Sequence, residues 1–118
     1  MTNSWTFDEA ERASTIGGTR RGLSPLRFNL SYNTNNALLA SVYCTNDFLT
    51  WTNAFDTMDR TTNITWKTGT YSVATLTYLY NNADMVTQKI SVLSGKTYTN
   101  AYGYNDLDWL TSETIRGS

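Results

Sequence analysis

The chain has 118 residues, a formal net charge of −1 at pH 7, 16% charged residues and 14% aromatic residues. This length predicts one domain whose core needs neither metals nor disulfides. The near-neutral charge argues against nucleic-acid binding, because several Lys or Arg side chains are needed to neutralise a phosphate backbone. No apolar run approaches the roughly 20 residues that cross a bilayer, so we expect no membrane span.

Histidine is absent and the single cysteine is Cys44. The absence of histidine removes the usual general base at neutral pH, and with one cysteine it also argues against a zinc site. Cys44 follows an apolar segment, and we predict that it is a small buried side chain. We therefore expect no cofactor, no metal and no enzymatic activity.

Residues 1–24 differ in composition from the rest of the chain and are predicted to form an N-terminal arm. A short helix is expected over residues 7–13, with Ser4 or Thr6 as its cap and acidic residues near its positive end. The β domain is expected to span residues 25–118.

The second half of this arm is locally basic, with Arg20 and Arg21 between glycines. Glycine on both sides predicts an irregular segment. The arm either docks on a neighbouring subunit or an anionic partner, or it is a solvated tail. Its acidic start lacks the basic and apolar regions of a signal peptide.

Downstream of the arm, the chain is predicted to form strands separated by turns. Residues 26–32 alternate between apolar and polar side chains, which predicts a half-buried strand. Residues 37–44 are apolar at nearly every position and predict a central strand or a helical turn. Shorter strands are expected at 48–51 and 64–66, with a loop over 53–62.

The clearest pattern predicts a meander of three antiparallel strands over residues 70–104. Residues 70–80 are rich in β-branched and aromatic side chains, which favour a strand. Residues 86–92 alternate with period two, and Gly95 lies in a three-residue segment typical of a hairpin loop. Residues 107–115 predict a short helix, or a final strand instead.

These segments predict an all-β fold: an antiparallel two-layer sandwich, or flattened barrel, of about seven strands. A sheet with one apolar face needs a second layer, which we assign to the upstream strands. We find no internal repeat. The stretches 69–73, 90–92 and 94–97 resemble the closing strands of transthyretin-like and carboxypeptidase-regulatory-like sandwiches, a resemblance that rests on common strand and turn residues.

Carboxylates are the only candidate catalytic groups in the sequence, since a glycosidase needs just two. None has a diagnostic spacing, so we interpret each as a turn or cap residue. The candidates are Asp47, Asp56, Asp59, Asp106, Asp108 and Glu113. The stretch 105–108 offers oxygens to calcium but falls far short of an EF-hand loop, and a helix cap is the other interpretation.

Aromatic side chains are too numerous for the core of so small a domain. They are expected to form a strip that serves as a subunit interface, as ordinary core and rim, or as a platform for stacking sugars. The predicted interface residues are Arg20, Arg21, Trp66, Tyr78, Tyr80, Tyr98 and Tyr102.

The combination of a β fold, a basic arm and surplus aromatics predicts a non-enzymatic structural subunit of a repeating assembly. We expect a virion or phage particle component, or an extracellular filament, that contacts copies of itself or neighbouring structural subunits. The alternative is a glycan-binding or adhesion module that uses surface Tyr and Trp. A virion or extracellular location is expected, and a cytoplasmic one otherwise.

Overall fold

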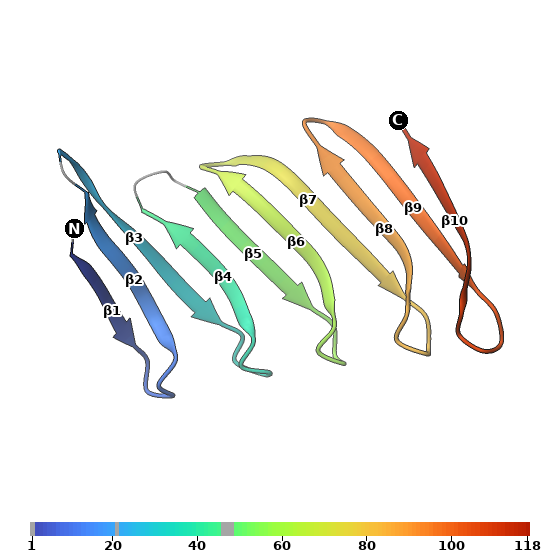
Figure 1. Ribbon diagram of the computed structural model, residues 1–118, viewed down its shortest axis with the longest axis horizontal. Helices are drawn as coiled ribbons and strands as arrows, with labels where there is room; N and C mark the ends of the chain where they lie inside the picture. The colour runs from blue at the N-terminus through green and yellow to red at the C-terminus, as the bar shows by residue number, and fades with distance from the viewer. Residues whose placement is uncertain (1, 21, 46–48) are drawn as a thin grey trace.

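The computed structural model describes residues 2–20, 22–45 and 49–118. Its ten strands lie side by side in chain order in one open antiparallel sheet (Figure 1). The strands are β1 Asn3–Phe7, β2 Ala13–Arg20, β3 Leu23–Tyr32, β4 Leu39–Cys44, β5 Leu49–Phe55, β6 Thr61–Thr68, β7 Tyr71–Tyr80, β8 Val86–Leu93, β9 Lys96–Tyr104 and β10 Leu110–Gly117. The prediction of an all-β antiparallel fold is confirmed.

The ten strands form one layer, whereas we expected about seven strands in two layers. Each strand contacts only its neighbours in the sequence, and no second layer covers the described strands (Figure 1). The radius of gyration is 18.1 Å, while a compact chain of this length has about 13.5 Å. Alternation along a strand shows which side chains share a face, but not which element packs on that face.

Strands replace both predicted helices. β1 ends at Phe7 and β2 begins at Ala13, so the expected helix over residues 7–13 is a tight turn. Residues 107–115 contribute to the last turn and β10, which is the strand alternative. The predicted arm thus contains two strands of the same sheet, and the boundary at residue 24 lies inside β3.

The meander is confirmed as β7, β8 and β9, while the loop expected over residues 53–62 is much shorter. β5 continues to Phe55 and β6 begins at Thr61. Between β8 and β9 the chain turns through Ser94 and Gly95, both with positive φ. This left-handed pair matches the twist of the flanking strands and closes a tight hairpin.

The sheet consists of five hairpins, so the chain contains an internal repeat that our sequence prediction missed. Four of the hairpins have turns of equal length, and the turn of the second hairpin is one residue longer. Each hairpin ends its first strand on an aromatic residue that is followed by Asp or Asn. These pairs are Phe7-Asp8, Tyr32-Asn33, Phe55-Asp56, Tyr80-Asn81 and Tyr104-Asn105. The aromatic residue recurs every 23–25 residues, and the five turns lie along one edge of the molecule (Figure 1).

Side-chain hydrogen bonds to the backbone shape these turns. In the third turn, Asp56 Oδ1 accepts hydrogen bonds from the backbone N–H groups of Met58 and Arg60 at 2.9 and 3.0 Å. Asp59, with φ of 62°, reverses the chain. Asp and Asn favour such turns because their short side chains bond to the backbone two residues on. The turns at Asp8, Asn81 and Asn105 repeat the pattern.

A register shift follows the turn in all five hairpins. In the fourth hairpin, Tyr80 pairs with Val86 and Leu79 pairs with Gln88, so Thr87 is an extra residue. Equivalent shifts occur in the other four. An extra residue changes which side chains point to each face. Val86 and Lys89 therefore share a face although they lie three positions apart, an odd number that would place them on opposite faces of a regular strand.

Little of the described chain is buried. Cys44 is 3% exposed, as predicted, and Ser91 is the only other buried residue among those described. Across residues 2–20, 22–45 and 49–118, no helix is long and apolar enough to cross a membrane.

Candidate interaction surface

The register of the strands places most large aromatic side chains on one face of the sheet. Trp51 lies directly opposite Trp66, and Trp66 lies opposite Ala74. Directly opposite residues in an antiparallel pair project to the same side. We call this side the aromatic face; it carries Trp5, Phe7, Tyr32, Trp51, Trp66, Tyr78, Tyr80, Tyr98, Tyr102 and Tyr104.

The opposite side, which we call the threonine face, is rich in hydroxyl groups. One row of directly paired residues crosses seven strands on this side. The row is Ser31, Ser41, Thr52, Thr65, Thr75, Val92 and Thr97. The two faces thus differ in chemistry, and only the aromatic one offers large apolar side chains across most of the sheet.

Five of the seven predicted interface residues share the aromatic face. Tyr98 is 39% exposed, and the other four, Trp66, Tyr78, Tyr80 and Tyr102, are half-buried. The side chain of Arg20 and the whole of Arg21 lie outside the described residues. The structure therefore brings the predicted aromatic strip together, while its role as an interface stays a prediction.

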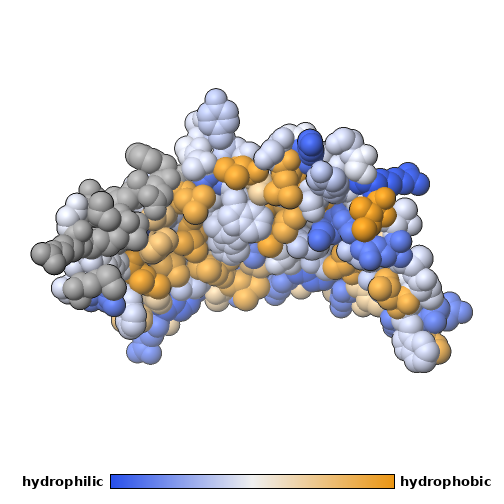
Figure 2. All heavy atoms as spheres, turned by 45° about the horizontal axis from the view of Figure 1, so that its top comes forward, coloured by the Kyte–Doolittle hydropathy of each residue, from blue (hydrophilic) through white to orange (hydrophobic). Residues whose placement is uncertain are grey.

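Apolar side chains reach the surface on the face shown in Figure 2, from the N-terminal to the C-terminal strands. Near the C-terminal edge the aromatic face has a shallow depression of about 260 Å³. It is lined by Tyr78, Val86, Lys89, Tyr102, Tyr104 and Leu110. Three tyrosines around one lysine can stack on a flat ligand and bond to its polar groups.

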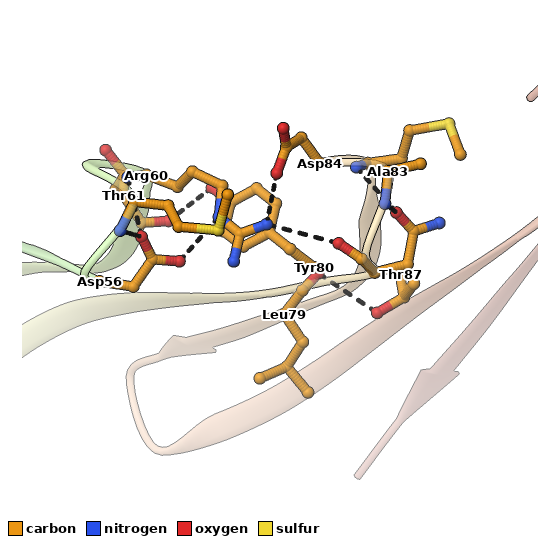
Figure 3. A network of polar contacts seen from close by, with 11 residues as sticks. Asp56, Arg60, Thr61, Leu79, Tyr80, Ala83, Asp84 and Thr87 are labelled. Carbon is orange, nitrogen blue, oxygen red and sulfur yellow. Dashed lines mark hydrogen bonds and ion pairs between the residues drawn. The ribbon is translucent and has the colours of Figure 1, made fainter.

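Polar contacts tie the third hairpin to the fourth (Figure 3). The Arg60 guanidinium donates to Asp56 Oδ2 at 2.7 Å and to Asp84 Oδ1 at 2.8 Å. It also lies 4.6 Å from the centre of the Tyr80 ring. The Tyr80 hydroxyl donates to the Thr61 carbonyl at 2.5 Å. Tyr80 is therefore held in place by its own sheet, so it is less available to a partner than the other strip residues.

The first and second hairpins repeat this arrangement. Arg12 donates to Asp8 Oδ2 at 2.8 Å and lies 4.3 Å from the centre of the Tyr32 ring. The Tyr32 hydroxyl donates to the Ala13 carbonyl at 2.8 Å. In the fifth hairpin, the Tyr104 hydroxyl donates in the same way to Val86, at 2.7 Å.

Charge and burial shift the pKa values of groups in these turns. Backbone and side-chain hydrogen bonds from Arg12 lower the pKa of Asp8 and outweigh the effect of burial. For Asp56, burial raises the pKa, but hydrogen bonds from Arg60 and Met58 outweigh it and leave the pKa lowered. Burial raises the pKa of Tyr80 above its ordinary value. The two lowered pKa values thus reflect hydrogen bonds within the turns, and the raised one reflects burial.

The remaining candidate carboxylates lie in turns or on the last strand. Asp59 and Asp108 have positive φ at turn positions, while Asp106 is exposed. Glu113 accepts a hydrogen bond from Asn100 at 2.9 Å, and Asp47 lies outside the described residues. Asn105 Oδ1 accepts from Leu107 and Trp109 in the last turn. Among the described residues, no three His, Cys, Asp or Glu side chains cluster to hold a metal.

The comparison with known proteins gives no family. No family model matches the chain, and no curated protein matches it significantly.

Proposed function

We propose that this chain is a non-enzymatic structural subunit of a repeating assembly, in which another protein layer covers the aromatic face. The virion, phage or extracellular setting expected from composition stays a prediction. The proposal rests on one observation, the amount of surface that the single sheet leaves exposed.

The chain exposes 8390 Å², whereas a compact protein of this mass exposes about 6500 Å². The excess over that value is roughly 1900 Å², more than twice the area of about 800 Å² that each partner buries in a standard protein–protein interface. A sheet with one apolar face is stable when another layer covers that face. The excess therefore supports a partner that supplies the layer.

The aromatic face is the better candidate for this contact. Tyr and Trp are enriched in protein interfaces because they bury large areas and still place a polar group at the rim. Trp51 and Trp66 lie side by side near the middle of the sheet, and Tyr98 is already exposed. A charge placed among these rings would oppose their burial in an interface.

Absolute mass by light scattering over a concentration series tests the proposal. We expect species larger than the 13.3 kDa monomer. Tyr98→Lys, on the aromatic face, should shift the mass toward the monomer because a buried unpaired charge is costly. Thr97→Lys changes the next residue on the threonine face and is the matched control, which should leave the mass unchanged.

A monomer at every concentration would overturn the proposal. So would equal effects of the two lysine variants, because the two faces would then be equivalent in assembly. Circular dichroism of each variant shows whether a change in mass reflects loss of the interface or loss of the sheet.

The depression around Lys89 favours glycan binding as a second candidate function. Its tyrosines can stack on sugar rings, and Lys89 can donate hydrogen bonds or pair with an acidic sugar. In a glycan-binding screen, Tyr102→Ala should abolish retention of any glycan that the chain holds. Trp66→Ala, which lies outside the depression, should retain it. Retention by the Tyr102 variant would exclude this depression as the site.

A further inference from the structure

In the part of the chain that the structure describes, each of the two edge strands has a strand neighbour on one side only. Among the described residues, β1 pairs only with β2 and β10 pairs only with β9. The two edges lie at opposite ends of the sheet (Figure 1). An open edge is a template for another strand. Both edges carry exposed aromatics close to a turn, with Phe7 62% and Trp109 67% exposed.

The four junctions between consecutive hairpins show which strand fits such an edge. In each junction, the third residue of one hairpin's second strand pairs with the residue three positions before the next hairpin's aromatic. The pairs are Thr15 with Asn29, Ser41 with Thr52, Asn63 with Thr77, and Gln88 with Ala101. The junction therefore has one fixed register, although its sequence varies.

The side chains next to the turns differ between junctions: some junctions pair an arginine with an aromatic ring, and others have apolar side chains at both positions. Arg12 and Arg60 reach over Tyr32 and Tyr80 in two junctions. In the second junction the equivalent positions are apolar, with Leu38 before β4 and Phe55 at the end of β5.

We infer that β10 of one molecule pairs with β1 of a second copy, in the register of the four internal junctions. Ser112, the third residue of β10, then lies opposite Ser4, which is three residues before Phe7. Trp109 then lies beside Phe7, and both side chains are apolar, as are Leu38 and Phe55 at the equivalent positions of the second junction.

The placement of the two serines on the sheet supports this register. Ser112 pairs with Gly103 and Ser4 pairs with Gly17, and both positions belong to the threonine face, so the two faces continue from one copy to the next. A head-to-tail contact leaves each new end open and produces filaments or rings. This inference rests on the proposed function and adds a second contact to it, because edge pairing extends the sheet and leaves the aromatic face available to the covering layer.

Disulfide trapping tests the register. The double variant Ser4→Cys, Ser112→Cys should form covalent oligomers on a non-reducing gel, because paired residues have Cα atoms about 4.5–5.5 Å apart. Ser4→Cys with Thr114→Cys is the matched control on the same face. Its diagonal Cα separation of about 7–8 Å is too long for a disulfide. We expect at least about tenfold more cross-linking in the first variant.

The single variants test the polarity of the contact. Mixing Ser4→Cys with Ser112→Cys should give covalent dimers, while either variant alone should give none above the level due to Cys44. Dimers of one single variant alone would indicate symmetric pairing and overturn the inference.

Light scattering separates this inference from the function on which it rests. Assemblies that depend on Tyr98 but show no link between residues 4 and 112 would overturn head-to-tail pairing and leave the assembly role standing. A monomer at every concentration would overturn both.

Discussion

At the residue scale, a tyrosine hydroxyl links each of three hairpins to the one before it. Tyr32, Tyr80 and Tyr104 donate to the first residue of the preceding strand. The third hairpin has Phe55 at this position and has no hydroxyl to donate. The same position of the hairpin therefore accepts either tyrosine or phenylalanine.

Exchange of the hydroxyl group should change stability in opposite directions at two of these positions. Tyr80→Phe should lower the free energy of unfolding by about 0.5–1.5 kcal/mol, the usual net contribution of a hydrogen bond. Phe55→Tyr should raise it by up to about 1 kcal/mol, because the new hydroxyl can donate to the Leu39 carbonyl. Urea unfolding followed by circular dichroism measures both changes. A loss of stability in Phe55→Tyr would contradict the equivalence of the junctions.

The turn aspartates should make stability depend on acid pH. The pKa of Asp56 is lowered in the folded chain from its ordinary value of 3.8. Its charge therefore stabilises the fold above about pH 4, and this contribution is lost as the pH falls through the lower folded value. Asp56→Asn should keep the hydrogen bonds of the turn, because Asn81 accepts the same bonds in its own turn. The variant should lose the part of the stability that depends on the charge and therefore on pH.

Melting temperatures of wild type, Asp56→Asn and Asp56→Ala between about pH 3 and 7 check this prediction. The Asn variant should lie between wild type and Ala at neutral pH and approach wild type in acid. Equal melting temperatures of the Asn and Ala variants would show that the hydrogen bonds of the turn contribute little.

At the element scale, each of the five turns along one edge contains a residue in the left-handed region. None of these five residues is glycine. They are Glu11, Ala37, Asp59, Asp84 and Asp108. A left-handed conformation costs a non-glycine residue roughly 1 kcal/mol, least for Asp and Asn. The turns are therefore set by the preceding Asp or Asn rather than by glycine.

A glycine at one of these positions should relieve the strain. Asp59 is exposed, with φ of 62°, so Asp59→Gly should stabilise the chain by up to about 1 kcal/mol. Asp59→Val should destabilise it by about 1–2 kcal/mol, because a β-branched side chain fits this region poorly. Thermal unfolding measures both, and a more stable Val variant would contradict the assigned backbone conformation.

At the scale of the whole molecule, the sequence predicted strands better than it predicted their arrangement. Alternation over residues 86–92 and the loop at Gly95 identified the meander. Acidic residues at 8–11 suggested the start of a helix, because carboxylates favour helix N-termini as well as tight turns. The number of layers was not predictable, since periodicity along a strand contains no information about what packs on its face.

The candidate surface was predictable in part. The sequence predicted an aromatic strip that includes Tyr78, Tyr80, Tyr98 and Tyr102, and the register places all four on one face. The repeat was missed because its signal is short, an aromatic residue followed by Asp or Asn every 23–25 residues. The positions around it vary, as Arg12 and Leu38 show, so neighbouring hairpins share little sequence.

The pairing of every strand with its sequence neighbours has a consequence for how the chain folds. Short turns close each hairpin, so the entropic cost of bringing distant segments together is small. A sheet of this kind can start from any hairpin and grow in both directions, as in repeat proteins. Local opening should then begin at β1 and β10, and amide protons on β5 and β6 should exchange most slowly with solvent.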